Sequence, residues 1–222
     1  MQVISNLQEA LLCQVGKVPG SESFYLTGGT ALAHFYLKHR RSNDLDFFTS
    51  VEEVIDPFSR RLEEALKSSG IGVERRRGLR SFVELSAARG REGTMIHLAQ
   101  DAPFRFEPLK RFPEYPDLNV DTLPDIASNK LLALFGRATL RDFIDVYTLV
   151  TKGHFAAEAL VEMAQKKDPG FDLYWLGVAF ERVKTFGGSE PDLLLLEQSI
   201  PLERLQVFFG QWREKIVRTL SA

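Results

Sequence analysis

Apolar and polar residues alternate in short segments along the first half of the chain. Three segments, 71–76, 81–88 and 94–99, have the two-residue period of half-buried strands, and 24–27 and 44–48 are further strand candidates. Apolar residues at helical spacing predict helices over 1–16, 30–39 and 56–69, the last with Asp56 as N-cap. This order of elements favours an α/β (α+β) fold, in which a mixed sheet carries flanking helices.

The second half of the chain has a different pattern. Residues 101–124 contain five prolines among aromatic residues, so we expect an irregular connection with only short extended pieces. Helical spacing then predicts helices over 155–167, 171–186 and 202–220. We therefore predict an N-terminal domain, 1–123, and a C-terminal helical bundle, 124–222. Aromatic residues of this bundle are expected in its core, or in part at a partner surface: Trp175, Phe180, Phe208, Phe209 and Trp212.

Composition adds little to this picture. The 222 residues are 44% hydrophobic and 26% charged, as in ordinary globular proteins. No run of about 20 apolar residues and no signal-peptide pattern is present, which predicts a cytoplasmic protein with no membrane contact. The single cysteine, Cys13, excludes an intramolecular disulfide and a cysteine zinc site, and we expect it to be buried in the first helix.

Positive charge is concentrated locally. The net charge of −2 gives no overall signal for nucleic acid. Between residues 71 and 91, however, six arginines (75, 76, 77, 80, 89 and 91) stand against Glu74 and Glu84, and His39, Arg40 and Arg41 add further charge. Two interpretations stay open: a basic border that contacts nucleic acid, or solvated residues on strand faces and hairpin loops.

Residues 24–48 join a strand, a glycine pair, a short helix and a second strand without a spare loop. Gly28 and Gly29 can adopt backbone angles closed to other residues, so their amides can turn toward a bound group. Thr30 is the expected N-cap of the helix, whose free amides and positive dipole end would lie at the same place. The arrangement is typical of phosphate binding, although a glycine pair before a helix is also a common tight turn.

Two aspartates follow on the second strand. Asp44 and Asp46 lie two residues apart in an apolar run, so in a strand both project from one face. Charged side chains are costly among Leu45, Phe47 and Phe48, and a divalent metal ion relieves that cost. The alternative is a strand end with solvated carboxylates. Together, the glycine pair and the aspartate pair favour a site for phosphate and metal.

These residues carry a family resemblance. The sequence GGT at 28–30, followed by RSNDLDF at 41–47, resembles the signature of the polymerase-beta-like nucleotidyltransferases, and in detail the AbiEii/AbiGii toxins of type IV toxin–antitoxin systems. The resemblance implies an enzyme that uses Mg²⁺ (or Mn²⁺) to transfer a nucleotide from a nucleoside triphosphate (NTP), in some members to the 3′ end of tRNA. It implies that Gly28, Gly29 and Thr30 hold the triphosphate, that Asp44 and Asp46 hold metal, and that an antitoxin protein is a partner.

Such enzymes usually carry a third metal-binding carboxylate on a neighbouring strand, and here the resemblance is incomplete. His97 stands where that carboxylate is expected, in the segment MIHLAQD. Imidazole suits Mg²⁺ poorly because this ion prefers oxygen ligands, so we leave His97 out of the metal site. Glu84 is the alternative third ligand, and Asp101 is expected to lie beyond the strand. We favour a site without a conventional third carboxylate.

A second segment with candidate chemistry spans 125–150. In one continuous helix, Lys130, Arg137 and Arg141 would share a basic stripe, within about 40° at roughly 100° per residue. If Gly136 and Thr139 break the helix instead, a second helix starts near Thr139.

The resemblance assigns roles in this segment. The toxins pair a lysine in a K-L-x-A-L helix with an aspartate in R-D-x-x-D, which here are Lys130 and either Asp142 or Asp145. Lys130 would contact triphosphate oxygens, with Arg141 as a further nucleotide-binding candidate. One of the two aspartates would orient the lysine or the acceptor hydroxyl. The alternative is an ordinary surface helix with an ion pair between Arg141 and Asp145.

We therefore expect an Mg²⁺-dependent nucleotidyltransferase with its active site between the two domains and a tRNA 3′ end as the favoured acceptor. In the expected mechanism an acceptor hydroxyl attacks the α-phosphorus and pyrophosphate leaves. Two alternatives remain: transfer to a protein hydroxyl of a partner, or a catalytically silent protein that binds only a nucleotide or a partner.

Overall fold

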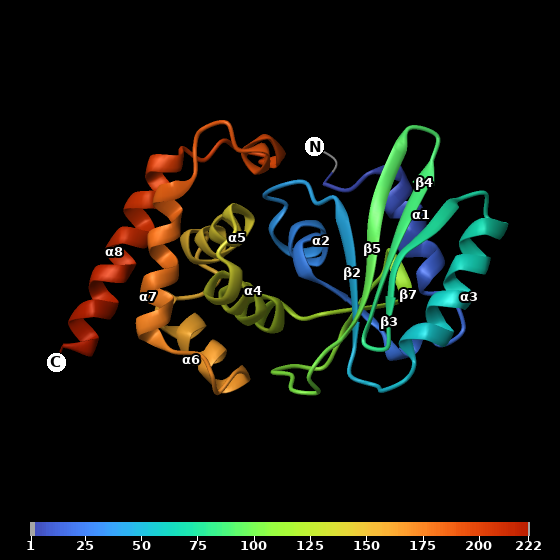
Figure 1. Cartoon of the computed structure of the whole chain (residues 1–222), viewed down its shortest axis with the longest axis horizontal. Coiled ribbons are helices and arrows are strands. Elements are labelled where there is room, and N and C mark those ends of the chain that lie inside the picture. The colour runs from blue at the N-terminus through green and yellow to red at the C-terminus, as the bar shows by residue number, and fades with distance from the viewer. Residues whose placement is uncertain (1–2, 222) are drawn as a thin grey trace. The chain divides into compact units, whose positions relative to one another are not determined.

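The computed structural model describes residues 3–221, and the chain divides into two compact units, Met1–Leu123 and Pro124–Ala222 (Figure 1). The first unit contains three α-helices and all the strands of the described chain. Their bounds are α1 Asn6–Val15, β1 Tyr25–Thr27, α2 Gly28–Ala31, β2 Asp44–Thr49, α3 Ile55–Ser68, β3 Gly72–Leu79, β4 Phe82–Arg89, β5 Glu92–Gln100, β6 Lys110–Phe112 and β7 Tyr115–Val120.

Among residues 3–221, seven strands form one mixed sheet in the order β3-β4-β5-β2-β1-β7-β6. The central strand β2 pairs antiparallel with β1 and parallel with β5, and β7 is parallel to β1. The predicted fold class, a mixed sheet with flanking helices followed by a helical bundle, is confirmed.

The two faces of β2 differ in burial. Leu45 and Phe47 are fully buried and pair in register with Ile96 and Leu98 of β5. Helices α1 and α3 pack on this side of the sheet, whereas α2 lies on the other side against β2 (Figure 1). The aspartates that alternate with Leu45 and Phe47 therefore project from the half-exposed face that carries α2.

The helix after the glycine pair starts earlier than predicted. It begins at Gly28, directly after Thr27 as N-cap, and continues as a π-helix over Leu32–Leu37. Thr30 is thus an interior residue, and its predicted role as N-cap is wrong. The reason is the positive φ of Gly28, +70°, which turns the chain from strand into helix at once.

Three further predictions in this unit need correction. Helix α3 follows Val54 as N-cap rather than Asp56, which forms an ion pair with Arg60 at 3.0 Å. Cys13 is exposed, because the buried stripe of α1 does not include it. The connection expected at 101–124 contains the hairpin of β6 and β7, which prolines obscured in the sequence: Pro113 lies in the turn and Pro116 is exposed.

The second unit is helical. Its helices are α4 Leu123–Arg137, which starts at the last residue of the first unit, α5 Leu140–Thr151, α6 Ala157–Lys167, α7 Leu173–Glu181 and α8 Leu202–Leu220. Phe180, Phe209 and Trp212 are in its core as predicted, but Trp175 is 60% exposed, so the expectation that it lies in the core is wrong for this residue. None of the helices described is long and apolar enough to cross a membrane.

Candidate functional site

Gly28 and Gly29 allow two side chains to approach the backbone closely. A Cβ at Gly28 would overlap Oδ2 of Asp46, and the φ of +70° is itself unfavourable for other residues. A Cβ at Gly29 would lie 2.7 Å from a guanidinium nitrogen of Arg40, which is buried. Gly28 is therefore required by its surroundings, and it lies directly against one of the two predicted metal-binding carboxylates.

Asp44 and Asp46 lie on β2 as predicted, both half-buried on the same face of the sheet. Thr27, at the end of β1, is the register partner of Asp46, which explains why the glycine pair meets this carboxylate. The side chain of Thr30 is fully buried and donates its hydroxyl to the carbonyl of Asp44. The structure thus brings the glycine pair and both aspartates together. The hydrogen bond from Thr30 ties α2 to the backbone of β2.

His97 stands beside Asp46, across from it in the register of β2 and β5. Its Nδ1 lies 2.9 Å from Oδ1 of Asp46, and its Nε2 lies 3.5 Å from Oε2 of Glu84 on β4. The hydrogen bond to Asp46 raises the pKa of His97, against the opposing effect of burial; the charges of Asp46, Asp44 and Glu84 raise it further. The imidazole thus lies between Asp46 and Glu84, the alternative third ligand.

The donor set fits a metal ion that is shared with substrate. Within residues 3–221, no group of three or more histidine, cysteine, aspartate or glutamate side chains is arranged to hold a metal ion. Mg²⁺ in nucleotide enzymes is usually held by one or two carboxylates plus phosphate oxygens and water. Asp44 and Asp46, with Oδ2 of Asp46 against the glycine pair, match that requirement. Asp101, one residue beyond β5, accepts a hydrogen bond from Tyr25.

In the second unit, Lys130 and Asp145 form a buried ion pair. Lys130 Nζ of α4 lies 2.8 Å from Asp145 Oδ2 of α5, and the side chains are 9% and 0% exposed. Because α5 follows a break at Ala138, with φ +48°, the two residues lie on separate helices. The interpretation of this segment as an ordinary surface-charged helix is therefore wrong.

Asp142 has a different environment. Both of its carboxylate oxygens accept hydrogen bonds of 2.9 Å from Arg137, and one also accepts from the amide and hydroxyl of Thr139, the N-cap of α5. Burial alone would raise the pKa of Asp142, but the bond from Arg137, the charge of Lys130 and the bond from Thr139 together hold it below the usual value. This aspartate secures the start of α5.

Arg141 and a second buried pair make further charged contacts in the bundle. Arg141 Nε lies 3.4 Å from Asp192 Oδ1, and the arginine side chain is 42% exposed. Lys167 at the end of α6 pairs with the fully buried Asp125 of α4 at 3.0 Å. The sequence analysis missed this second pair, because residues about 40 apart in sequence give no periodic signal.

The basic border was one of two open interpretations of the local positive charge, and the structure lowers the free positive charge available for it. Three of its arginines pair with acidic side chains: Arg75 with Glu63, Arg76 with Glu74, and Arg80 with Glu53. His39 and Arg40 are buried, whereas Arg41 is exposed. The charge count over residues 71–91 overestimated the free positive charge, because Glu53 and Glu63 lie outside that segment but pair with its arginines.

A buried hydrogen-bond network next to the glycine pair was also not predicted from the sequence. It includes Thr27, the residue before Gly28. The fully buried carboxylate of Asp121 accepts hydrogen bonds of 2.7 Å from both the Thr27 hydroxyl and Arg105. Arg105 in turn lies 3.9 Å above the ring of Tyr25. The network joins the end of β1 to the residue after β7, and its two charged members, Arg105 and Asp121, come from the proline-rich stretch 101–124.

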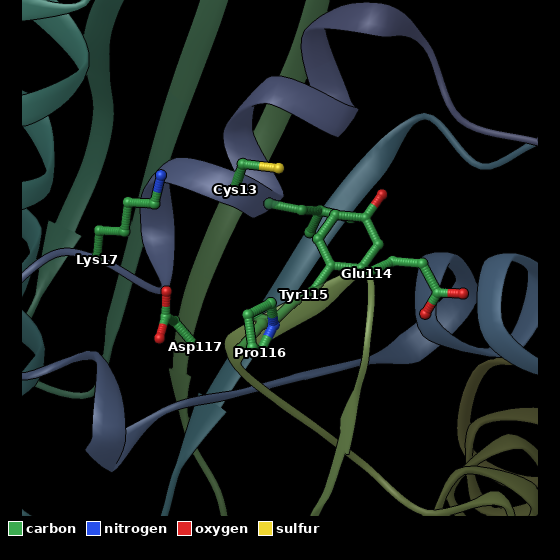
Figure 2. Close-up of a pocket in the computed structure, with 8 residues that line it drawn as sticks. Cys13, Lys17, Glu114, Tyr115, Pro116 and Asp117 are labelled. Atoms are coloured by element: carbon green, nitrogen blue, oxygen red, sulfur yellow. The ribbon is translucent and has the colours of Figure 1, made fainter.

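A separate pocket of about 320 Å³ lies between α1 and the β6–β7 hairpin (Figure 2). Its lining includes Cys13, Lys17, Glu114, Tyr115 and Asp117. Burial raises the pKa of Tyr115 to about 12. None of the residues predicted to hold nucleotide or metal lines this pocket.

Two solved structures share the fold. A Helicobacter pylori protein, described as a candidate nucleotidyltransferase, aligns with a TM-score of 0.58 and 22% identity over 97% of this chain and 93% of its own. JHP933 from Helicobacter pylori aligns with a TM-score of 0.56 and 20% identity over 97% of this chain and 90% of its own. Residues 3–221 thus have the fold of these structures, with the glycine pair and the aspartate pair adjacent.

Sequence comparison defines the family. Residues 10–215 match the family described as nucleotidyl transferase AbiEii toxin of type IV toxin–antitoxin systems. An uncharacterized protein of Aquifex aeolicus (strain VF5) is 30% identical over 183 residues, which are 78% of this chain and 79% of that protein. The chain therefore belongs to the AbiEii toxin family and is a nucleotidyltransferase, which confirms the resemblance seen in the sequence.

Proposed function

We propose that this nucleotidyltransferase binds Mg²⁺ or Mn²⁺ at Asp44 and Asp46 and transfers a nucleotide from an NTP to an acceptor hydroxyl. One observation carries most of the argument: the space that a side chain at Gly28 would need is taken by Oδ2 of Asp46. Phosphate oxygens bound at the amides of Gly28 and Gly29 would therefore lie beside a carboxylate with which they can share a cation.

The chemistry is an in-line displacement at the α-phosphorus. A bond forms between the acceptor oxygen and the α-phosphorus, and the acceptor hydroxyl gives up its proton to water. The bond to the oxygen bridging the α- and β-phosphates breaks, and pyrophosphate leaves with that oxygen. Asp44 and Asp46 would hold the divalent cation, which would supply positive charge to neutralise the phosphates and polarise the reacting oxygens. The glycine pair positions the triphosphate, and Asp44 and Asp46 fix where the cation is held.

Lys130 is proposed to bind triphosphate oxygens, and Asp145 to hold the lysine in place. An ammonium group has three hydrogens, so Lys130 can donate to Asp145 and to phosphate at the same time. Arg141 remains a candidate for a further phosphate contact. Asp142 is proposed to act indirectly, by keeping the start of α5 in place through Arg137.

The favoured acceptor is the 3′ hydroxyl of tRNA, as the family resemblance suggests, and the reaction is placed in the cytoplasm, where NTPs and tRNA occur. The description of the family as a type IV toxin supports a cognate antitoxin as partner. The exposed Arg41, next to the glycine-aspartate segment, is the residue that best supports a nucleic-acid acceptor.

The test is incubation of the protein with Mg²⁺, each α-labelled NTP in turn and total tRNA, beside the Asp44→Ala/Asp46→Ala variant. Label on tRNA with the wild type only is the expected result, and it names the nucleotide. Label on protein with the wild type only would support nucleotide transfer but make a protein hydroxyl, and not tRNA, the acceptor. Equal labelling by wild type and variant would refute the proposed metal site.

A further inference from the structure

Asp46 is held from two sides, and the two oxygens of its carboxylate have different neighbours. Oδ1 lies 2.9 Å from Nδ1 of His97, whereas Oδ2 lies against Gly28. An ionised carboxylate has no hydrogen to donate, so Nδ1 of His97 carries the hydrogen of this bond. The bond fixes the rotation of the carboxylate and leaves Oδ2 beside the glycine pair.

His97 has two further neighbours on β4. Its Nε2 lies 3.5 Å from Glu84 Oε2, and its ring centroid lies 5.8 Å from that of Phe82. The strand register places Asp46, His97 and Glu84 opposite one another on β2, β5 and β4. Three adjacent strands thus present a carboxylate, an imidazole and a second carboxylate in one row. The imidazole of His97 lies between the two carboxylates and contacts both.

We infer that His97 is a positioning residue for the metal-binding carboxylate of Asp46, with Glu84 holding the imidazole from the far side. This inference rests on the proposed function, because it assumes that Asp46 binds the cation. It explains why a histidine can stand where a third carboxylate is expected: His97 orients the ligand and does not add one. Residues that orient metal ligands in this way typically affect metal affinity or activity by about 10–100-fold.

Three substitutions separate orientation from ligation. His97→Leu removes the hydrogen-bond donor and puts an apolar side chain of moderate size in its place. His97→Asn keeps a donor near the position of Nδ1 but loses the contact with Glu84. Glu84→Ala leaves the imidazole in place but removes its second partner.

The measurement is Mn²⁺ affinity by electron paramagnetic resonance, with α,β-methylene analogues of ATP, CTP, GTP and UTP in turn. His97→Leu should weaken Mn²⁺ binding by roughly 10–100-fold, and His97→Asn by no more than about three-fold. Glu84→Ala should have a smaller effect than His97→Leu. Excess Mn²⁺ should restore nucleotide transfer by His97→Leu but not by Asp46→Asn, a split that a purely structural role would not produce.

Each outcome has a separate meaning. Wild-type affinity in His97→Leu would overturn the inference while leaving the metal site at Asp46 intact. Nitrogen hyperfine coupling to Mn²⁺ in the wild type, lost in both His97 variants, would make His97 a metal ligand and also overturn it. If the wild type and Asp46→Asn bind Mn²⁺ equally, the proposed function itself fails, and the role of His97 fails with it.

Discussion

At Gly28, two independent constraints exclude a side chain: a φ of +70° and the overlap of a Cβ with Asp46. We expect Gly28→Ala to lower nucleotide transfer at least about ten-fold, because the carboxylate must move from the place where a metal ion is shared. The measurement is the rate of label transfer from an α-labelled NTP.

Gly70 provides the matched control for this substitution. Its φ is +74°, but nothing lies within 4 Å of a Cβ placed there. Gly70→Ala should lower the free energy of unfolding by about 1–2 kcal/mol, the cost of the left-handed conformation, and leave the transfer rate unchanged. Equal loss of activity in both variants would mean that backbone strain, and not contact with Asp46, explains the effect.

At the residue scale, the sequence predicted what is local. The glycine pair and the two aspartates could be identified because their spacing within one segment determines where they point. The contact between Asp46 and His97 could not be predicted, because it depends on the register of two strands that lie about 50 residues apart. The burial of Arg40 was missed because it depends on the space beside Gly29, which exists only in the folded chain.

At the scale of elements, the start of α5 depends on Asp142. This carboxylate is fully buried, and its pKa is lowered by Arg137, Lys130 and Thr139 against the effect of burial. Asp142→Asn should therefore lower the free energy of unfolding by about 1–3 kcal/mol at neutral pH.

The pH dependence of this loss follows from the sign of the shift. Because the folded-state pKa lies below the ordinary value of 3.8, the stabilisation is complete above about pH 4 and disappears as pH falls through the lowered pKa. Thermal unfolding of wild type and Asp142→Asn between pH 2 and 7 should show a difference that closes only in acid. A difference in stability between wild type and Asp142→Asn that does not change with pH would show that the charge of Asp142 is not the cause.

The pair of Lys130 and Asp145 joins α4 to α5 as well as serving the proposed site. Lys130→Met removes the cation that pairs with the fully buried carboxylate of Asp145 and should cost about 3–5 kcal/mol of stability. The double variant Lys130→Met/Asp145→Leu should recover most of that stability and still fail to transfer nucleotide. Calorimetry measures the stability of the variants, and the transfer assay measures their activity. An active double variant would show that the pair has only a structural role.

Elements with a clear period were predictable and those interrupted by proline were not. Strands β3 to β5 and helices α6 and α8 follow their apolar patterns closely. The break between α4 and α5 was one of two alternatives, and Ala138 at positive φ decides it. The hairpin of β6 and β7 was hidden because Pro113 and Pro116 fall in exposed positions that the strand pattern tolerates.

At the scale of the whole molecule, the fold class could be predicted from the sequence, but the positive charge of the surface was overestimated. Arg76 and Arg80 already pair with Glu74 and Glu53, whereas Arg41 is exposed beside the glycine-aspartate segment. Arg76→Ala and Arg80→Ala should leave the salt dependence of tRNA binding nearly unchanged. Arg41→Ala should reduce the slope of log affinity against log salt by about 1. Equal effects of the three variants would contradict this assignment of the surface.

The central claim is that Asp44 and Asp46 support transfer of the nucleotide and not of a terminal phosphate. The most direct measurement uses one NTP carrying label at the α-phosphate in one reaction and at the γ-phosphate in another, with wild type and Asp44→Ala/Asp46→Ala. We expect α-label on the acceptor and γ-label in pyrophosphate, with wild type only. Label from the γ-phosphate on the acceptor, or equal turnover by the variant, would contradict it.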